Sequence, residues 1–65
     1  MTNYSIMIAE GTKVLSSERG LVTLKGLVVV DAIRERDGGY SYSVAGERFY
    51  ASGGTVRVIH KGGAA

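Results

Sequence analysis

Short apolar or alternating runs, separated by turns that contain glycine, follow one another along the whole chain. The runs are rich in Val, Ile, Tyr, Phe and Thr, and none sustains the apolar stripe of an amphipathic helix. Such runs between turn residues are typical of an all-β meander, sandwich or barrel. We therefore predict an all-β fold, a small antiparallel meander, sandwich or barrel-like subunit, with one domain at 1–60 and a flexible tail at 61–65. The predicted strands cover residues 3–9, 13–16, 21–24, 27–35, 40–44, 47–51 and 55–60.

The segment 27–35 is apolar on both of its faces. Apolar residues on both faces indicate a central strand that is covered twice, or a strand that faces a neighbouring subunit. Because side chains alternate along a strand, the two sets separate by parity, Leu27, Val29 and Ile33 on one face and Val28, Val30 and Ala32 on the other.

Three sites in the C-terminal half favour tight hairpin turns, at residues 37–39, 45–46 and 52–53. Two-residue loops at 45–46 and 52–53 would fix the register of two successive hairpins. The expected cross-strand pairs are Val44 with Glu47, Ser43 with Arg48, Tyr42 with Phe49, Ala51 with Gly54, Tyr50 with Thr55, Phe49 with Val56, and Arg48 with Arg57.

This register sorts the side chains onto two faces. The predicted core face carries Tyr40, Tyr42, Val44, Phe49, Ala51, Val56 and Val58, with Glu47 at its margin. The predicted solvent face carries Ser41, Ser43, Arg48, Tyr50, Thr55, Arg57 and Ile59.

The expected pairing of Arg48 with Arg57 is the feature of the solvent face that points to a ligand. Like charges directly opposite each other destabilise a sheet, by up to about 1 kcal/mol. A phosphate held by both guanidinium groups would reverse that cost, and Tyr50 would offer a ring on which a base can stack. The alternative is two solvated arginines, or arginines paired with acids of a neighbouring subunit. The candidate ligand-binding residues are Arg48, Arg57, Tyr50, Ser41, Ser43, Thr55 and Lys25.

The length of 65 residues and the absence of cysteine narrow the means by which the fold is stabilised. A domain of this size has a small core, and disulfides and thiolate metal sites are excluded. Self-association is the remaining way to stabilise so small a core, so we expect a homo-oligomer, either a ring or a dimer. The net charge of +2 permits an anionic partner. No apolar run is long enough to span a bilayer and the N-terminal residues do not form a signal peptide, so a cytoplasmic location without membrane contact is expected.

Catalytic and cofactor motifs are absent from the sequence. A catalytic histidine needs an orienting carboxylate and a nucleophile, and no candidate for either lies near His60 in the sequence. The glycines match neither nucleotide-binding loop pattern, and we assign them to turns. We expect no enzyme, no cofactor and no metal. An active site assembled across subunits from His60, Asp31 and tyrosines is the open alternative.

Several segments resemble the trp RNA-binding attenuation protein family. They are Gly11-Thr12-Lys13-Val14-Leu15 with Arg19-Gly20 after it, the segment 24–30 with Glu35 beyond, and Val44-x-Gly46 with the tyrosine-bearing strand that follows. The resemblance implies a β-ring or a related oligomer and assigns RNA contact to Lys25. The chain lacks that family's tryptophan-covering loop, and Ser43-Val44-Ala45 replaces its Lys-Val-Arg segment. The resemblance therefore does not imply tryptophan sensing.

The sequence thus predicts a non-enzymatic oligomeric binding protein for a phosphate-bearing ligand, RNA or a small nucleotide. The alternative is a small phage-type inhibitor that acts against host defence or transcription. Such an inhibitor would bind a host protein or sequester a nucleotide signal. A structural role in a virion or shell also stays open.

Overall fold

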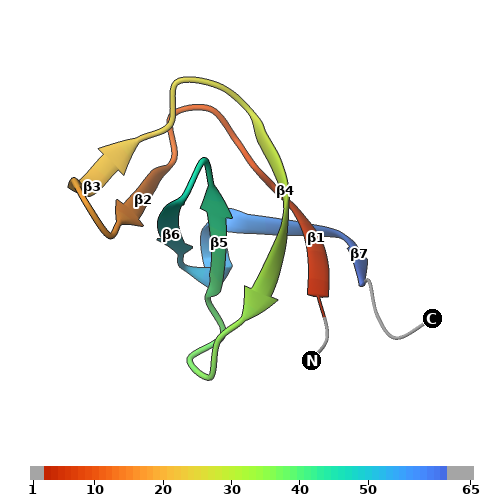
Figure 1. Cartoon of the computed structure of the whole chain (residues 1–65). Coiled ribbons are helices and arrows are strands. Elements are labelled where there is room, and N and C mark those ends of the chain that lie inside the picture. Colours follow the sequence, from red (N-terminus) through yellow and green to blue (C-terminus); the bar gives the residue numbers. More distant parts are fainter. Residues whose placement is uncertain (1–2, 62–65) are drawn as a thin grey trace.

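The computed structural model describes residues 3–61, which form a single antiparallel sheet of seven strands (Figure 1). The sheet order is β3-β2-β6-β5-β4-β1-β7, and the sheet is not closed into a barrel, so β3 and β7 are its edges. This confirms the all-β prediction, with every predicted strand end within one residue of the observed one. The elements are β1 (Asn3–Ile8), β2 (Lys13–Ser16), β3 (Gly20–Thr23), β4 (Val28–Arg34), β5 (Tyr40–Val44), β6 (Glu47–Ala51), the 3₁₀ turn η1 (Gly53–Thr55) and β7 (Val56–Lys61).

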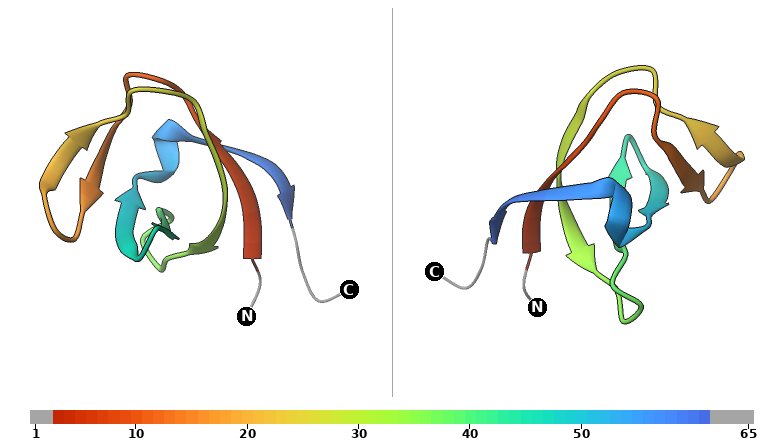
Figure 2. Two further views of the ribbon diagram at one scale, coloured as in Figure 1. Left: turned by 45° about the horizontal axis from the view of Figure 1, so that its top comes forward. Right: turned by 180° about the vertical axis from the view of Figure 1, so that it is seen from behind.

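The sheet curls so strongly that its inner face encloses the core (Figure 2). The largest fully buried side chains are Ile6 and Ile8 on β1 and Val14 on β2. The ring of Tyr42 stacks on that of Phe49 at a centroid distance of 5.2 Å, and burial raises the pKa of the Tyr42 hydroxyl. The buried core consists of Ile6, Ile8, Val14, Ala32, Tyr40, Tyr42 and Ala51.

The β5–β6 hairpin has the predicted turn and the predicted register. Ala45 and Gly46 form the two-residue loop with φ values of 52° and 84°, as a hairpin turn with two left-handed residues requires. Ser43 consequently lies opposite Arg48, and Tyr42 lies opposite Phe49. The predicted core face is confirmed at Tyr40, Tyr42 and Ala51, whereas Val44 and Val58 lie at its exposed margin.

The predicted β6–β7 hairpin is wrong. Residues 53–55 form η1 instead of a two-residue loop, because both the N–H and the hydroxyl of Thr55 donate to the carbonyl of Ser52, at 3.0 Å and 2.8 Å. The turn sends β7 across to β1, where Arg57 lies opposite Met7. Residue pairs 48/57, 50/55, 49/56 and 51/54 therefore do not form, since β6 pairs with β2 and β5 only.

Strand β1 lies between β4 and β7, and its fully buried residues Ile6 and Ile8 have a neighbouring strand on each side. Ile6 lies opposite Val30 on β4 and opposite Val58 on β7. Lys61, predicted to begin a flexible tail, is the last residue of β7 and lies opposite Tyr4. The rest of the predicted tail, 62–65, lies outside the described residues. Within residues 3–61 the structure has no helix long and apolar enough to cross a membrane.

Strand β4 lies between β5 and β1, but within residues 3–61 only one of its faces is covered, so it is not the doubly covered strand that the sequence allowed. The alternative, that its second face contacts a neighbouring subunit, stays a prediction. Val30 packs on the core and Ala32 is buried in it. On the other face, Val29 and the preceding Leu27 are 57% and 60% exposed, and Ile33 is also exposed. The outer face of β4 is thus free to contact a partner.

Candidate binding site on the outer sheet face

Four of the predicted ligand-binding residues lie together on the outer face of β5 and β6. Ser41 lies opposite Tyr50, and Ser43 lies opposite Arg48. Their proximity follows from the β5–β6 hairpin, whose tight turn fixes the register. The part of the predicted site that depended on this hairpin is therefore assembled as expected.

Two shallow hollows open on this face, and both are lined by Ser41 and Arg48. The β4–β5 hollow, of about 280 Å³, has polar groups from Asn3, Asp31 and Ser43 in its wall. The β2–β6 hollow, of about 210 Å³, is lined by Leu15, Phe49 and Tyr50. Arg48 thus stands between a recess that has several polar groups in its wall and a recess lined by Tyr50 and Leu15. No local pattern in the sequence points to Leu15, which lies opposite Tyr50 only through the long-range pairing of β2 with β6.

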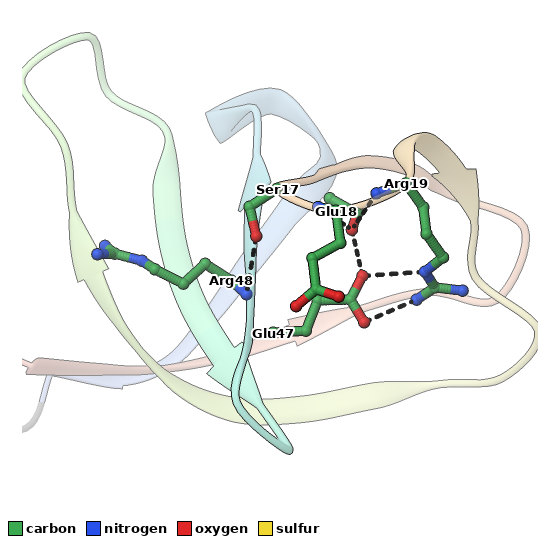
Figure 3. A network of polar contacts seen from close by, with 6 residues as sticks. Ser17, Glu18, Arg19, Glu47 and Arg48 are labelled. Carbon is green, nitrogen blue, oxygen red and sulfur yellow. Dashed lines mark hydrogen bonds and ion pairs between the residues drawn. The ribbon is translucent and has the colours of Figure 1, made fainter.

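The backbone of Arg48 is fixed, while its guanidinium has no acidic partner among residues 3–61. The Arg48 carbonyl accepts the N–H of Ser17 at 2.9 Å, and the Arg48 N–H donates to the Ser17 hydroxyl at 3.3 Å. The side chain points away from Glu47 and across β5 (Figure 3). The one ion pair within residues 3–61 joins Arg19 to Glu47. The charge of Arg48 is therefore available to a ligand.

Glu47 is neutralised by its own partners (Figure 3). The Arg19 guanidinium donates to both carboxylate oxygens, at 2.9 Å and 3.2 Å, and the buried Ser16 hydroxyl also donates to Glu47. The hydrogen bonds from Arg19, which have the largest effect, and from Ser16 hold the pKa of the Glu47 carboxyl below its usual value. The Ser16 oxygen also accepts the N–H groups of Glu18 and Arg19, both at 3.1 Å. This network holds the β2–β3 turn against β6.

Two of the hydroxyls that the sequence predicts to bind the ligand donate hydrogen bonds to acidic side chains of the protein instead. The Tyr50 hydroxyl donates to Asp37 at 2.5 Å, and the Ser41 hydroxyl donates to Glu35 at 2.5 Å. The hydrogen bond from Tyr50 lowers the pKa of the Asp37 carboxyl, and the Gly39 N–H, which donates to Asp37 at 2.9 Å, lowers it further. The same bond raises the pKa of Tyr50. Asp37 therefore positions the Tyr50 ring, and Ser43 is the hydroxyl directly beside Arg48.

The other three candidate residues lie elsewhere, which corrects the predicted site. Arg57 is on β7, Thr55 is in η1 with its hydroxyl bonded to Ser52, and Lys25 is in the exposed β3–β4 connection. The site loses its second arginine because the β6–β7 hairpin does not form.

A serine, a histidine and an aspartate meet in one cross-strand row of the outer face. Ser5 on β1 lies between His60 on β7 and Asp31 on β4, and its hydroxyl donates to Asp31 at 3.1 Å. A nucleophilic triad needs the histidine between the other two, so that the histidine removes the proton of the serine. Here the serine is in the middle and its proton is directed to the carboxylate. The row therefore reads as a surface polar contact, and the described residues contain no group of three potential metal ligands.

Comparison of the chain with protein-family models, with curated proteins and with solved structures finds no match. The resemblance to the trp RNA-binding attenuation protein family thus stays a prediction from sequence.

Proposed function

We propose that this protein is a non-enzymatic binding module that holds a phosphate-bearing ligand, a nucleotide or a segment of RNA, on the outer face of β5 and β6. The observation that carries the proposal is the position of Arg48 between two adjoining hollows, where its guanidinium has no acidic partner in the described part of the chain. An anion at Arg48 and a flat ring in the β2–β6 hollow would occupy the site together.

The chemistry on each side of Arg48 suits the two parts of a nucleotide. A guanidinium binds phosphate oxygens through two parallel hydrogen bonds, and the Ser43 hydroxyl lies on the neighbouring strand to supply a third. The β2–β6 hollow offers the ring of Tyr50 and the side chain of Leu15 to a base. Stacking of a base on an aromatic side chain contributes about 1–3 kcal/mol.

The acids around the site limit how many phosphates the ligand carries there. Glu35 and Asp37 flank Ser41 and Tyr50, and Asp31 lines the β4–β5 hollow. A chain of phosphates would bring negative charges together beyond Arg48, which is unfavourable. The site therefore favours a single phosphate, as in a mononucleotide or one phosphodiester of RNA, over a triphosphate.

The first test compares Arg48→Ala with Arg57→Ala in a fluorescence polarisation assay with labelled single-stranded RNA. Both variants remove one positive charge, but Arg57 lies across β1 on the far edge of the sheet. Loss of one charged contact lowers affinity by about tenfold or more, since such hydrogen bonds contribute roughly 1.5–3 kcal/mol. We expect this loss for Arg48→Ala and affinity close to that of the parent protein for Arg57→Ala.

Equal losses in the two variants would show that only net charge matters, and would contradict a site at Arg48. The salt dependence gives a second readout. Each phosphate contact on a single strand adds roughly −0.7 to the slope of log affinity against log salt. The slope should become shallower by about that amount in Arg48→Ala and stay unchanged in Arg57→Ala.

A second candidate function is supported by the exposed apolar residues of β4. Val29 lies directly opposite Met7 on the outer face, beside Leu27. Contiguous apolar surface of this kind is typical of protein interaction sites, so we also propose, as the alternative, a small phage-type inhibitor that binds a host protein. In that case Val29→Glu abolishes binding at fixed stoichiometry to the host protein, while Arg48→Ala leaves it intact. The reverse pattern would favour the nucleotide-binding module.

A further inference from the structure

Strand β3 leaves one end of the sheet open in the single chain. Within the described strands its only partner is β2, and its outer edge faces away from the molecule (Figure 1). An edge strand presents unpaired N–H and C=O groups that can template another strand, and proteins usually protect such edges with charges or bulges. Strand β3, Gly20-Leu21-Val22-Thr23, contains no charged residue, and its pairing with β2 has no register shift.

The opposite edge, β7, is protected in both ways. It carries Arg57, His60 and Lys61, and its pairing with β1 shifts register between Ser5 and Ile6. The two edges of the sheet therefore differ, and β3 is the edge suited to accept a strand.

The hydrogen bonds beside β3 show which of its groups are free. Leu24 is bonded toward β2, because its N–H donates to Thr12 at 2.8 Å and its carbonyl accepts the N–H of Gly11 at 2.9 Å. Alternate residues of a strand direct their peptide groups to the same side, so Val22 is also directed to β2. The peptide groups of Leu21 and Thr23 therefore point outward, two donors and two acceptors.

These groups are complementary to their own two-fold copy. We propose that two copies of this chain join β3 to β3 in antiparallel register, with Val22 opposite Val22 on the two-fold axis. Leu21 of each copy then pairs with Thr23 of the other, and all four outward groups are used. The result is one continuous sheet of two subunits, and this proposal does not depend on the identity of the ligand.

The side chains at this edge fit a second copy. Leu21 is 65% exposed and lies directly opposite Leu15, which is 51% exposed. Both leucines are on the outer face, and in the proposed register Leu21 lies directly beside Thr23 of the second copy. On the inner face, Val22 packs against the core, so two such valines continue the apolar interior across the axis. Since Leu15 also lines the β2–β6 hollow, the second copy lies next to the candidate ligand site.

Disulfide cross-linking tests the register directly, because the chain has no native cysteine. Opposed residues of a non-hydrogen-bonded antiparallel pair have Cα atoms about 4.5 Å apart, within the range that a disulfide needs. Val22→Cys should therefore form a covalent dimer under mild oxidation. Leu21→Cys is the matched control, because Leu21 faces Thr23 of the second copy and the two position-21 residues lie on a diagonal of about 7–8 Å. Equal cross-linking of both variants, or of neither, would overturn the register.

Sedimentation equilibrium of the cysteine-free chain tests the association itself. The parent protein should sediment with the mass of two chains, and Leu21→Lys should shift it toward one. Leu27→Lys is the control, because Leu27 is similarly exposed at 60% but lies outside β3. A monomeric parent, or dissociation by both lysine variants alike, would overturn the proposal. Circular dichroism of each variant distinguishes dissociation from loss of the fold.

Discussion

Arg19 and Arg48 lie on neighbouring hairpins, yet they have opposite roles. Arg19 is held by Glu47 and lies 6.0 Å from the centre of the Phe49 ring, so its charge stabilises the fold. Arg48 is anchored through its backbone by Ser17, and its side chain has no acidic partner within residues 3–61. Nothing in the sequence separates these two arginines. Arg19 is the arginine that pairs with Glu47, because the β2–β3 turn packs against β6.

The Glu47 contacts predict a specific dependence of stability on pH. The folded state holds the pKa of Glu47 below its unfolded value, which is about 4.3 for a glutamate. Its contribution is therefore present above that unfolded value and is lost as the pH falls through the lower folded value. Glu47→Gln should be less stable than the parent at pH 7, and the difference should shrink in acid. Urea unfolding of both proteins at neutral and acidic pH measures this.

Glu10→Gln is the matched control, because Glu10 has neither an ion pair nor a side-chain hydrogen bond in the described part of the chain. An equal acid response of the two variants would mean that the Arg19–Glu47 pair is not what makes stability depend on pH.

At the scale of elements, the two C-terminal turns show what local sequence can predict. Ala45-Gly46 gives the expected hairpin because glycine readily adopts the left-handed conformation that the second turn position needs. Ser52-Gly53 looks similar in sequence but is followed by Gly54 and Thr55, and Thr55 closes a 3₁₀ turn on Ser52. The bounds of β7 agree with the predicted strand within one residue, but β7 pairs with β1 and not with the predicted partner β6. Local residues set the turn, whereas the burial of β1 decides where β7 pairs.

The η1 turn predicts different effects for substitutions at two adjacent glycines. A methyl group built on Gly53 overlaps the backbone carbonyl of Gly38, whereas one built on Gly54 meets no atom within 4 Å. Because backbone cannot move aside as a side chain can, Gly53→Ala should cost about 1–3 kcal/mol of unfolding free energy. Gly54→Ala should be neutral or slightly stabilising. Chemical denaturation of both variants checks this, and equal effects would contradict the close approach of η1 to the 37–39 loop.

On the scale of the whole molecule, a small core depends on few side chains. Ile6 and Ile8 have no exposed surface, and β4 and β7 flank them. The sequence was sufficient to predict the strands and the inner face of β5 and β6, because alternation and turns are local signals. The sheet order was not predicted, because the pairing of β1 with β7 joins the two ends of the chain. The loss of Arg57 from the candidate site follows from this.

The burial of β1 predicts that Ile6→Ala endangers the fold. Removing a fully buried isoleucine costs about 2–5 kcal/mol, a large share of the roughly 3–10 kcal/mol expected for a chain of this length. Ile59→Ala is the control, because Ile59 on β7 is 53% exposed. Substitutions of surface residues usually change the free energy of unfolding by about 0.5 kcal/mol or less, so Ile59→Ala should have a small effect. Thermal unfolding followed by circular dichroism measures both. A small effect of Ile6→Ala would contradict the position of β1 between β4 and β7.

NMR titration of the ¹⁵N-labelled protein with adenosine 5′-monophosphate tests whether a ligand binds between the two hollows at Arg48. We expect the Arg48 side-chain Nε–H and the amides of Ser43, Tyr50 and Leu15 to shift together and saturate, while Arg57 and Thr55 stay unchanged. Shifts that centre on Arg57, or an Arg48 signal that does not move while others saturate, would contradict a ligand site at Arg48.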